Sequence, residues 1–110
     1  MAMLGKEIRM KRLVNQKSGK MMAITVDHAI SRGIAPLEGI HDIKGVIGKI
    51  VAGEPDAITM TKGIAESCFH DFAGTSTSLL LKCSSYSPVS PTQDFIFGDV
   101  DECVRMGADG

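Results

Sequence analysis

Short apolar runs alternate along the chain with longer segments in which apolar residues recur every three or four positions. The runs 21-MMAITV-26, 56-DAITMT-61 and 78-SLLLKC-83 have the length and composition of strands. The first run contains no charged residue, so we expect a strand that is covered on both faces. The second and third runs lead into Lys62-Gly63 and Ser84-Ser85, where these strands should end.

The segments outside these runs have helical spacing. Residues 4–14 predict a short amphipathic helix with Leu4, Ile8 and Leu13 facing inward. Residues 86–94 are rich in serine and proline and predict a loop, and residues 95–99 predict a short extra strand. The later positions with helical spacing are Ile40, Ile43, Ile47, Ile50 and Val51, then Ile64, Ala65, Cys68, Phe69 and Phe72, and finally Val100, Cys103 and Val104 after the capping-box pair Asp99 and Glu102.

Strand and helix alternate three times after the first helix, which is typical of parallel βα units. Right-handed crossovers would set the three strands side by side in one sheet. The order fits either a (β/α) barrel or an open doubly wound sheet. Neither G-x-G-x-x-G nor G-x-x-x-x-G-K-[ST] follows the first run, which removes the main support for a nucleotide-binding open sheet. We therefore expect one α/β domain over residues 1–110, formed by three βα units of a barrel and preceded by a short helix.

Composition narrows the class of protein. The net charge of −1 argues against a nucleic-acid surface, and no apolar run has the length of a membrane span. Charges near the N-terminus stand where a signal peptide needs its apolar centre. The cysteines, Cys68, Cys83 and Cys103, are odd in number and widely spaced, which indicates reduced thiols in the cytoplasm and no zinc site. We expect no bound metal or cofactor.

Reactive side chains follow all three predicted strands. In α/β folds the working groups lie at the carboxyl ends of strands, and neighbouring strands are only about 5 Å apart. An acid, an imidazole, an amine and hydroxyls could therefore converge on one pocket, a set that suits proton transfer and carbonyl chemistry. These side chains belong to Asp27-His28, Thr61-Lys62 and Ser84-Ser85.

Each of these residues also has a purely structural interpretation. Asp27 can cap a helix or accept a loop hydrogen bond, although we favour function for it, and His28 can simply satisfy a backbone carbonyl. Lys62 is more commonly a loop lysine or a phosphate contact than an imine-forming amine. Ser84 and Ser85 usually cap backbone groups.

Four segments, taken in order, resemble the archaeal-type class I aldolase family, the DeoC/FbaB/LacD-like group. This group includes class I fructose-bisphosphate aldolase and 2-amino-3,7-dideoxy-D-threo-hept-6-ulosonate synthase. The resemblance is carried by 5-GKEIRMKRLVNQKSGK-20 with the DH pair that follows, 36-PLEGIHDI-43, 56-DAITMTKGIAES-67 and 98-GDVDECVRMGADG-110. Ala29 and Thr61 depart from the family pattern, which commonly has glycine after the DH pair and histidine before the lysine.

The resemblance implies a (β/α)8 barrel that makes or breaks carbon–carbon bonds through a Schiff base, without metal. It implies that Asp27 moves protons, that His28 is its neighbour in the pocket, and that Lys62 and Ser84 contact a phosphorylated keto sugar. It also implies that Lys62 is not the imine-forming residue, because family members carry that lysine on the sixth strand.

Chain length changes this expectation. A barrel of this kind needs about 250 residues, so we expect an N-terminal portion that is inactive by itself. The alternative is a non-catalytic module whose open sheet edges pair with a second copy in a homo-oligomer. Within the enzyme class, heptulosonate synthase, thiolase-like and fructose-bisphosphate aldolase activities remain open.

Overall fold

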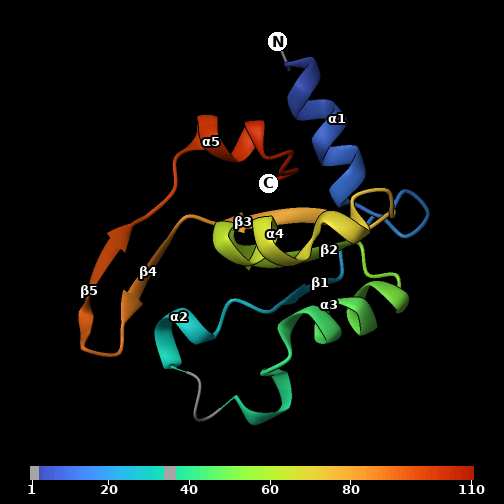
Figure 1. Ribbon diagram of the computed structural model, residues 1–110. Helices are drawn as coiled ribbons and strands as arrows, with labels where there is room; N and C mark the ends of the chain where they lie inside the picture. Colours follow the sequence, from blue (N-terminus) through green and yellow to red (C-terminus); the bar gives the residue numbers. More distant parts are fainter. Residues whose placement is uncertain (1–2, 34–36) are drawn as a thin grey trace.

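The computed structural model describes residues 3–33 and 37–110 (Figure 1). A three-stranded sheet lies at the centre, with helices on both sides and a hairpin at one end. The segment 36-PLEGIHDI-43 begins in the part that is not described. The elements are α1 (Leu4–Leu13), β1 (Ala23–Thr25), α2 (Ala29–Arg32), η1 (Glu38–Ile40), α3 (Ile43–Ala52), β2 (Ala57–Thr61), α4 (Lys62–Cys68), η2 (His70–Phe72), β3 (Ser78–Lys82), β4 (Ser84–Ser87), β5 (Ser90–Ile96) and α5 (Val100–Arg105).

The sheet has the order β1-β2-β3, and both pairings are parallel. Ile24 aligns with Ile58 and Leu79, and Val26 extends the first pairing by donating its amide to Thr59 O at 2.9 Å. The predicted alternation of three strands with helices in a parallel α/β sheet is therefore confirmed. That these units belong to a barrel stays a prediction.

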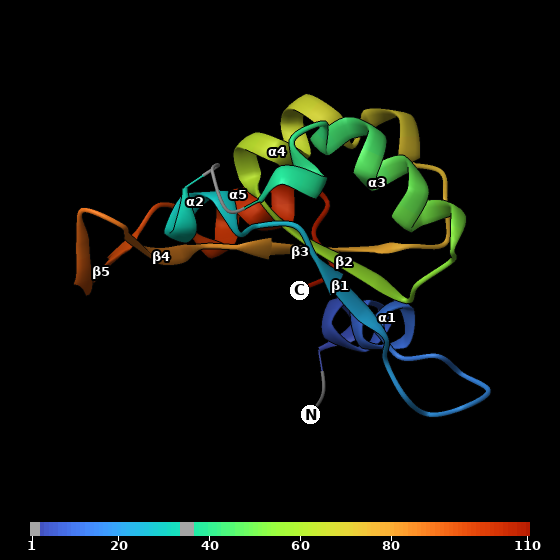
Figure 2. The ribbon, with the colours of Figure 1, turned by 90° about the horizontal axis from the view of Figure 1, so that it is seen from below.

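One face of the sheet carries the core. Ile58 and Met60 on β2 and Ile47 on α3 have no exposed surface. Figure 2 shows α3 and α4 on this side of the sheet and α1 on the other. Because side chains alternate along a strand, the opposite face of β2 and β3 presents Thr59, Thr61 and Lys82. That face leads to the polar groups described below.

The prediction that the first strand is covered on both faces is wrong. Ala23 and Thr25 are exposed, and Ile24 is half-buried. In the described part of the chain, β1 pairs only with β2 and therefore forms an edge of the sheet. An apolar run alone does not distinguish an edge strand from a central one.

The inward side of α1 also differs from the prediction. Leu4 and Ile8 are 71% and 43% exposed, whereas Leu13 is only 8% exposed. Leu13 lies close to Gly110, at the end of the chain segment that follows α5. Only the C-terminal end of α1 reaches the body of the protein, so most of its apolar positions face outward.

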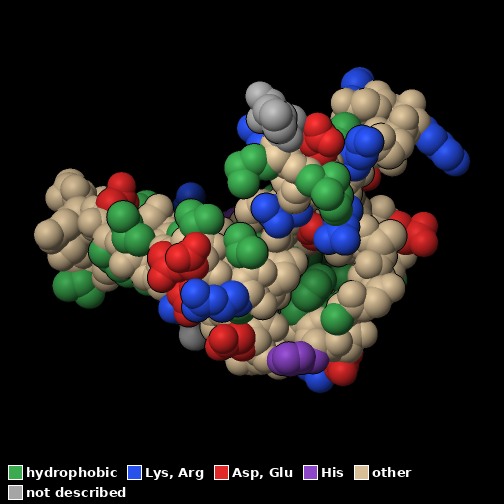
Figure 3. Space-filling model, turned by 90° about the horizontal axis from the view of Figure 1, so that it is seen from above, with side chains coloured by type: hydrophobic (Ala, Val, Ile, Leu, Met, Phe, Trp, Pro, Cys, Tyr) green, Lys and Arg blue, Asp and Glu red, His purple; other side chains and the backbone are tan. Residues whose placement is uncertain are grey.

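Residues 86–94 do not form the predicted loop. β4 and β5 pair as an antiparallel hairpin, which projects from the body in Figures 1 and 3. The turn falls at Pro88 and Val89, and Pro91 is tolerated because β5 pairs on one side only. β4 packs against α2. Pairing between the two strands therefore overrides the loop-like composition.

Candidate functional site

The carboxyl ends of β1 and β3 bring Asp27 and Lys82 together on the sheet face opposite the core. Thr25 and Asp27 are two positions apart in extended chain, so both point to the same side. Lys82 is the last residue of β3 and aligns with Thr61, which is the last residue of β2. The polar side chains at the ends of three neighbouring strands thus lie together at the carboxyl end of the sheet.

Asp27 is buried, and both of its carboxylate oxygens have polar partners. The Lys82 ammonium lies 2.8 Å from Asp27 Oδ2, and the Thr25 hydroxyl donates a hydrogen bond to Asp27 Oδ1. The whole Asp27 residue is 8% exposed, whereas the Lys82 side chain is 30% exposed. A carboxylate and an ammonium are therefore held in contact, with the ammonium on the side of the pair that reaches solvent.

The pKa of Asp27 lies below its usual value of 3.8. Burial, the largest single influence, raises the pKa, but hydrogen bonds from Lys82 and Thr25 and the positive charge of Lys82 together outweigh it. Asp27 is consequently ionised at neutral pH. It is suited to accept a proton or to orient a cation, and it is unsuited to donate a proton before it has first taken one.

This pKa shift predicts how stability depends on pH. A carboxyl whose pKa is lower when folded contributes stability that is present above its unfolded pKa and is lost as the pH falls through the folded value. The Asp27→Asn variant should therefore be less stable than the wild-type chain at pH 7. The difference should shrink as the pH falls below about 4. Urea unfolding at a series of pH values measures it, and a difference that stays constant down to pH 2 would contradict the assignment.

Two buried polar atoms on residues close in the chain to Asp27 and Lys82 have no hydrogen-bond partner among the described residues: Nδ1 of His28 and Oγ of Ser85. His28 follows Asp27 directly, and Ser85 lies on β4, which packs against α2. Buried polar atoms are normally paired, so an orphaned atom at a strand end indicates a group that a ligand or water satisfies. Ser85 is only 6% exposed.

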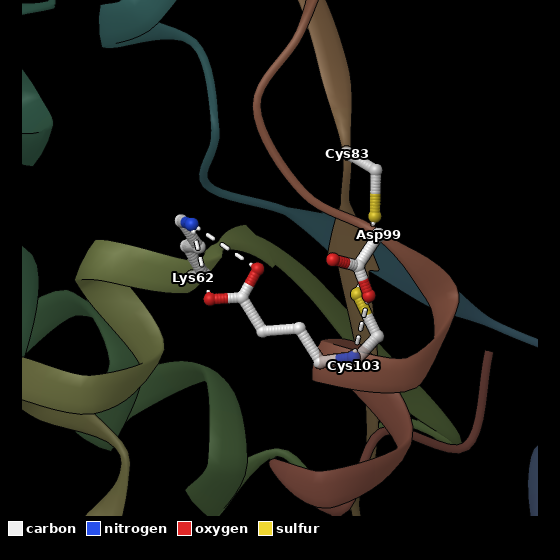
Figure 4. A network of polar contacts seen from close by, with 5 residues as sticks. Lys62, Cys83, Asp99 and Cys103 are labelled. Atoms are coloured by element: carbon white, nitrogen blue, oxygen red, sulfur yellow. Dashed lines mark hydrogen bonds and ion pairs between the residues drawn. The ribbon is translucent and has the colours of Figure 1, made fainter.

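Other residues expected at the site are placed differently. Lys62 turns toward α5, where its ammonium lies 3.1 and 3.2 Å from the two carboxylate oxygens of Glu102 (Figure 4). Glu102 raises the pKa of Lys62. Ser84 is exposed at the start of β4. The structure therefore brings Lys82, and not Lys62, to Asp27, and it buries Ser85 in preference to Ser84.

Lys82 was not singled out from the sequence, whereas Ser85 was named together with Ser84 at the end of the third strand. Lys82 falls inside an apolar run, where a lysine is easily taken as a break at the end of a strand. The available signal was its position: Lys82 is an even number of residues from Ser78, so both side chains belong to the same, polar face of the strand.

Neither a metal centre nor a membrane segment is found in residues 3–33 and 37–110. No group of three or more histidine, cysteine or acidic side chains in these ranges is arranged to hold a metal ion. No helix there has the length and hydropathy needed to cross a membrane.

Comparison with curated proteins finds aldolase-like relatives. The chain is 27% identical over 109 residues to the 2-amino-4,5-dihydroxy-6-oxo-7-(phosphonooxy)heptanoate synthase of Streptomyces griseus, a match that covers 98% of this chain and 39% of that protein. It is 32% identical over 79 residues to an uncharacterized aldolase of Saccharolobus solfataricus, a match that covers 72% of this chain and 28% of the aldolase. No family model matches the sequence.

These relatives support an aldolase-like family for the chain, so the resemblance seen in the sequence motifs is confirmed at that level. The chain spans less than half the length of the curated relatives that it matches.

Proposed function

From this distant relationship to aldolase-like proteins, we propose that the chain forms the proton-transfer side of a Schiff-base aldolase pocket. Asp27 is the acid/base group, Lys82 keeps it ionised, and His28 and Ser85 contact the substrate. The observation that carries the proposal is the buried Asp27–Lys82 pair at the strand ends, with unpartnered polar atoms on residues close to it in the chain.

The chemistry of an aldol reaction needs a base in this position. Bond formation requires removal of a proton from the carbon next to an iminium, and bond cleavage requires removal of a proton from a hydroxyl group. An ionised carboxylate that is shielded from water can do both, since it accepts the proton and later returns it. The lowered pKa of Asp27 keeps this carboxyl ionised, which is the form that accepts a proton.

The proposed substrates are phosphorylated keto compounds. The name of the Streptomyces griseus relative describes an oxo group next to a carbon that carries a phosphonooxy group. Fructose-bisphosphate aldolase, heptulosonate synthase-like and thiolase-like activities all fall within the proposal. The imidazole of His28 and the hydroxyl of Ser85 are groups that suit substrate hydroxyl or carbonyl oxygens.

The imine-forming lysine is proposed to lie outside residues 1–110. Lys82 is paired with Asp27, and Lys62 is paired with Glu102. An amine forms an imine only when it is unprotonated, and a carboxylate in contact favours the protonated ammonium. Glu102 raises the pKa of Lys62, and the Lys82 ammonium is held 2.8 Å from Asp27 Oδ2, so neither side chain is free to attack a carbonyl in this arrangement.

Ligand binding to the chain tests the proposal. Titration of the ¹⁵N-labelled chain with dihydroxyacetone phosphate should shift the amide resonances of residues 25–28, 82 and 85. Glycerol 3-phosphate, which lacks the ketone, should produce smaller shifts. Ser85→Ala should weaken binding by about tenfold through loss of one buried hydrogen bond, while the neighbouring variant Ser84→Ala should bind as the wild type does.

Two outcomes would contradict the proposal. One is the absence of shifts at the strand ends. The other is shifts confined to the cavity of about 560 Å³ that is lined by Arg12, Thr75 and Asp109, because that cavity does not include the Asp27–Lys82 pair.

A second candidate is a non-catalytic homo-oligomer. It is favoured by the outer edge of β1, which has no strand partner in the described part of the chain, whereas the outer edge of β3 already hydrogen-bonds Asp109 and Gly110. Such edges invite pairing with another chain. Gel filtration measures the oligomeric state, and the titration measures binding of dihydroxyacetone phosphate. A stable oligomer that does not bind this phosphorylated ketone supports the second candidate.

A further inference from the structure

Two of the three cysteines lie in contact just after the end of β3, where Cys83 directly follows Lys82. The Sγ atoms of Cys83 and Cys103 are 3.2 Å apart (Figure 4). Both residues are half-buried free thiols. Cys83 follows the last residue of β3, and Cys103 lies in the middle of α5.

The backbone around both sulfurs is held in place. The Phe97 amide donates to Cys83 O at 2.9 Å, which closes the base of the hairpin. On the other side, the Asp99 carboxylate accepts from the Glu102 amide at 2.8 Å and caps α5. Glu102 in turn binds Lys62 at the start of α4 (Figure 4). The close approach of the two sulfurs is therefore a consequence of the fold.

We propose that Cys83 and Cys103 form a redox site, in which a peroxide converts the two thiols into a disulfide that ties β3 to α5. A disulfide has a sulfur–sulfur distance of about 2.05 Å, so the sulfurs must approach by only about another 1 Å. Nothing in the proposed aldolase chemistry requires this pair, and the proposal stands independently of it.

The oxidation takes two steps. The Cys83 thiolate attacks one oxygen of hydrogen peroxide, which breaks the O–O bond and leaves a sulfenic acid and hydroxide. The Cys103 sulfur then attacks the sulfenic sulfur, and the hydroxyl group leaves as water. Overall, two thiols and one peroxide give one disulfide and two waters; both sulfurs are oxidised and the peroxide oxygens are reduced.

The contact between the two sulfurs also affects the acidity of Cys103. The hydrogen bond with Cys83, then burial and the negative charge on Cys83, raise the pKa of Cys103 to about 11. The nearby carboxylates of Glu102 and Asp99 act in the same direction. The proposal assigns the first attack to Cys83 and the second to Cys103, whose proton completes the departing water.

The disulfide would close a loop from residue 83 to residue 103 that contains the whole β4–β5 hairpin. The hairpin carries Ser85, and it projects from the body with β5 exposed along its length (Figure 3). Closing the loop restricts the unfolded chain and anchors the base of the hairpin. Oxidation should therefore stabilise the segment that holds Ser85.

Treatment of the folded full chain with hydrogen peroxide tests the proposal. We expect the loss of two hydrogens in the intact mass and one remaining titratable thiol. Peptide mapping should find Cys83 joined to Cys103, and dithiothreitol should reverse the change. The thermal midpoint should rise by on the order of 10 °C on oxidation.

Matched variants separate this site from general thiol oxidation. Cys68→Ser should form the disulfide as the wild type does, whereas Cys103→Ser should stop at a sulfenic acid that dimedone traps on Cys83, with no rise in midpoint. In urea, where the geometry is lost, all pairs of cysteines should be linked. The proposal would be overturned if peroxide left the folded chain with three free thiols, or if pairs that include Cys68 were as abundant as Cys83–Cys103.

Discussion

Replacing Lys82 with methionine is expected to lower the free energy of unfolding at pH 7 by about 2–3 kcal/mol. The substitution keeps most of the length of the side chain and removes its charge. Asp27, which is 8% exposed, then remains buried without its ammonium partner. The loss should be smaller than for a fully buried ion pair because the Lys82 side chain is 30% exposed. Urea unfolding, followed by circular dichroism, measures the change.

The double variant Asp27→Asn/Lys82→Met should recover much of this loss, since it removes both charges at once. A surface ion pair provides the matched control. Lys44 and Asp71 are 2.9 Å apart, but their side chains are 59% and 66% exposed, so Lys44→Met should leave the free energy of unfolding nearly unchanged. Equal losses for the Lys82 and Lys44 variants would show that the Asp27–Lys82 pair is no more than a surface contact.

The second large effect concerns catalysis. In a chimera in which residues 1–110 replace the matching part of the Streptomyces griseus synthase, Asp27→Asn should lower kcat by about 10²–10⁴-fold. The amide has the shape of the carboxylate but cannot take up a proton. Substrate binding should change much less, because the contacts of His28 and Ser85 remain. Steady-state kinetics with a phosphorylated ketone measures both quantities.

Asp71→Asn makes the same chemical change at an exposed position in η2, the short helix that follows α4. It should leave kcat within about twofold of the unsubstituted chimera. If Asp27→Asn behaves like Asp71→Asn in a folded, active chimera, proton transfer does not depend on Asp27, and the role of the strand-end pair is structural.

The sheet was predictable from the sequence because each of its strands is marked by a short apolar run in its own segment. The runs at 56–61 and 78–83 become β2 (Ala57–Thr61) and β3 (Ser78–Lys82), and the helices between them follow their apolar spacing. The hairpin was not predictable in this way. Its strands consist largely of serine, threonine and proline, and they are stabilised by pairing with each other and by packing of β4 on α2.

The site was predictable in part. Asp27 follows an apolar strand, and that pattern alone marks it as a candidate. The cation that pairs with Asp27 is decided by the register of the strands, which sets the side chains that lie at the same end and on the same face of the sheet. The register is a property of the assembled sheet. Lys62 begins a helix and turns toward Glu102, whereas Lys82 ends a strand on the face shared with Thr61 and meets Asp27. Local sequence does not distinguish these two lysines.

Borohydride trapping in the chimera tests the central claim most directly. Incubation with dihydroxyacetone phosphate and sodium borohydride should fix a reduced imine on one lysine, which peptide mass spectrometry locates. We expect that lysine to lie in the part contributed by the Streptomyces griseus synthase, and we expect Asp27→Asn to preserve the adduct while lowering kcat by about 10²–10⁴-fold. An adduct on Lys82 or Lys62, or none in a folded chimera whose parent synthase is labelled, would contradict the account.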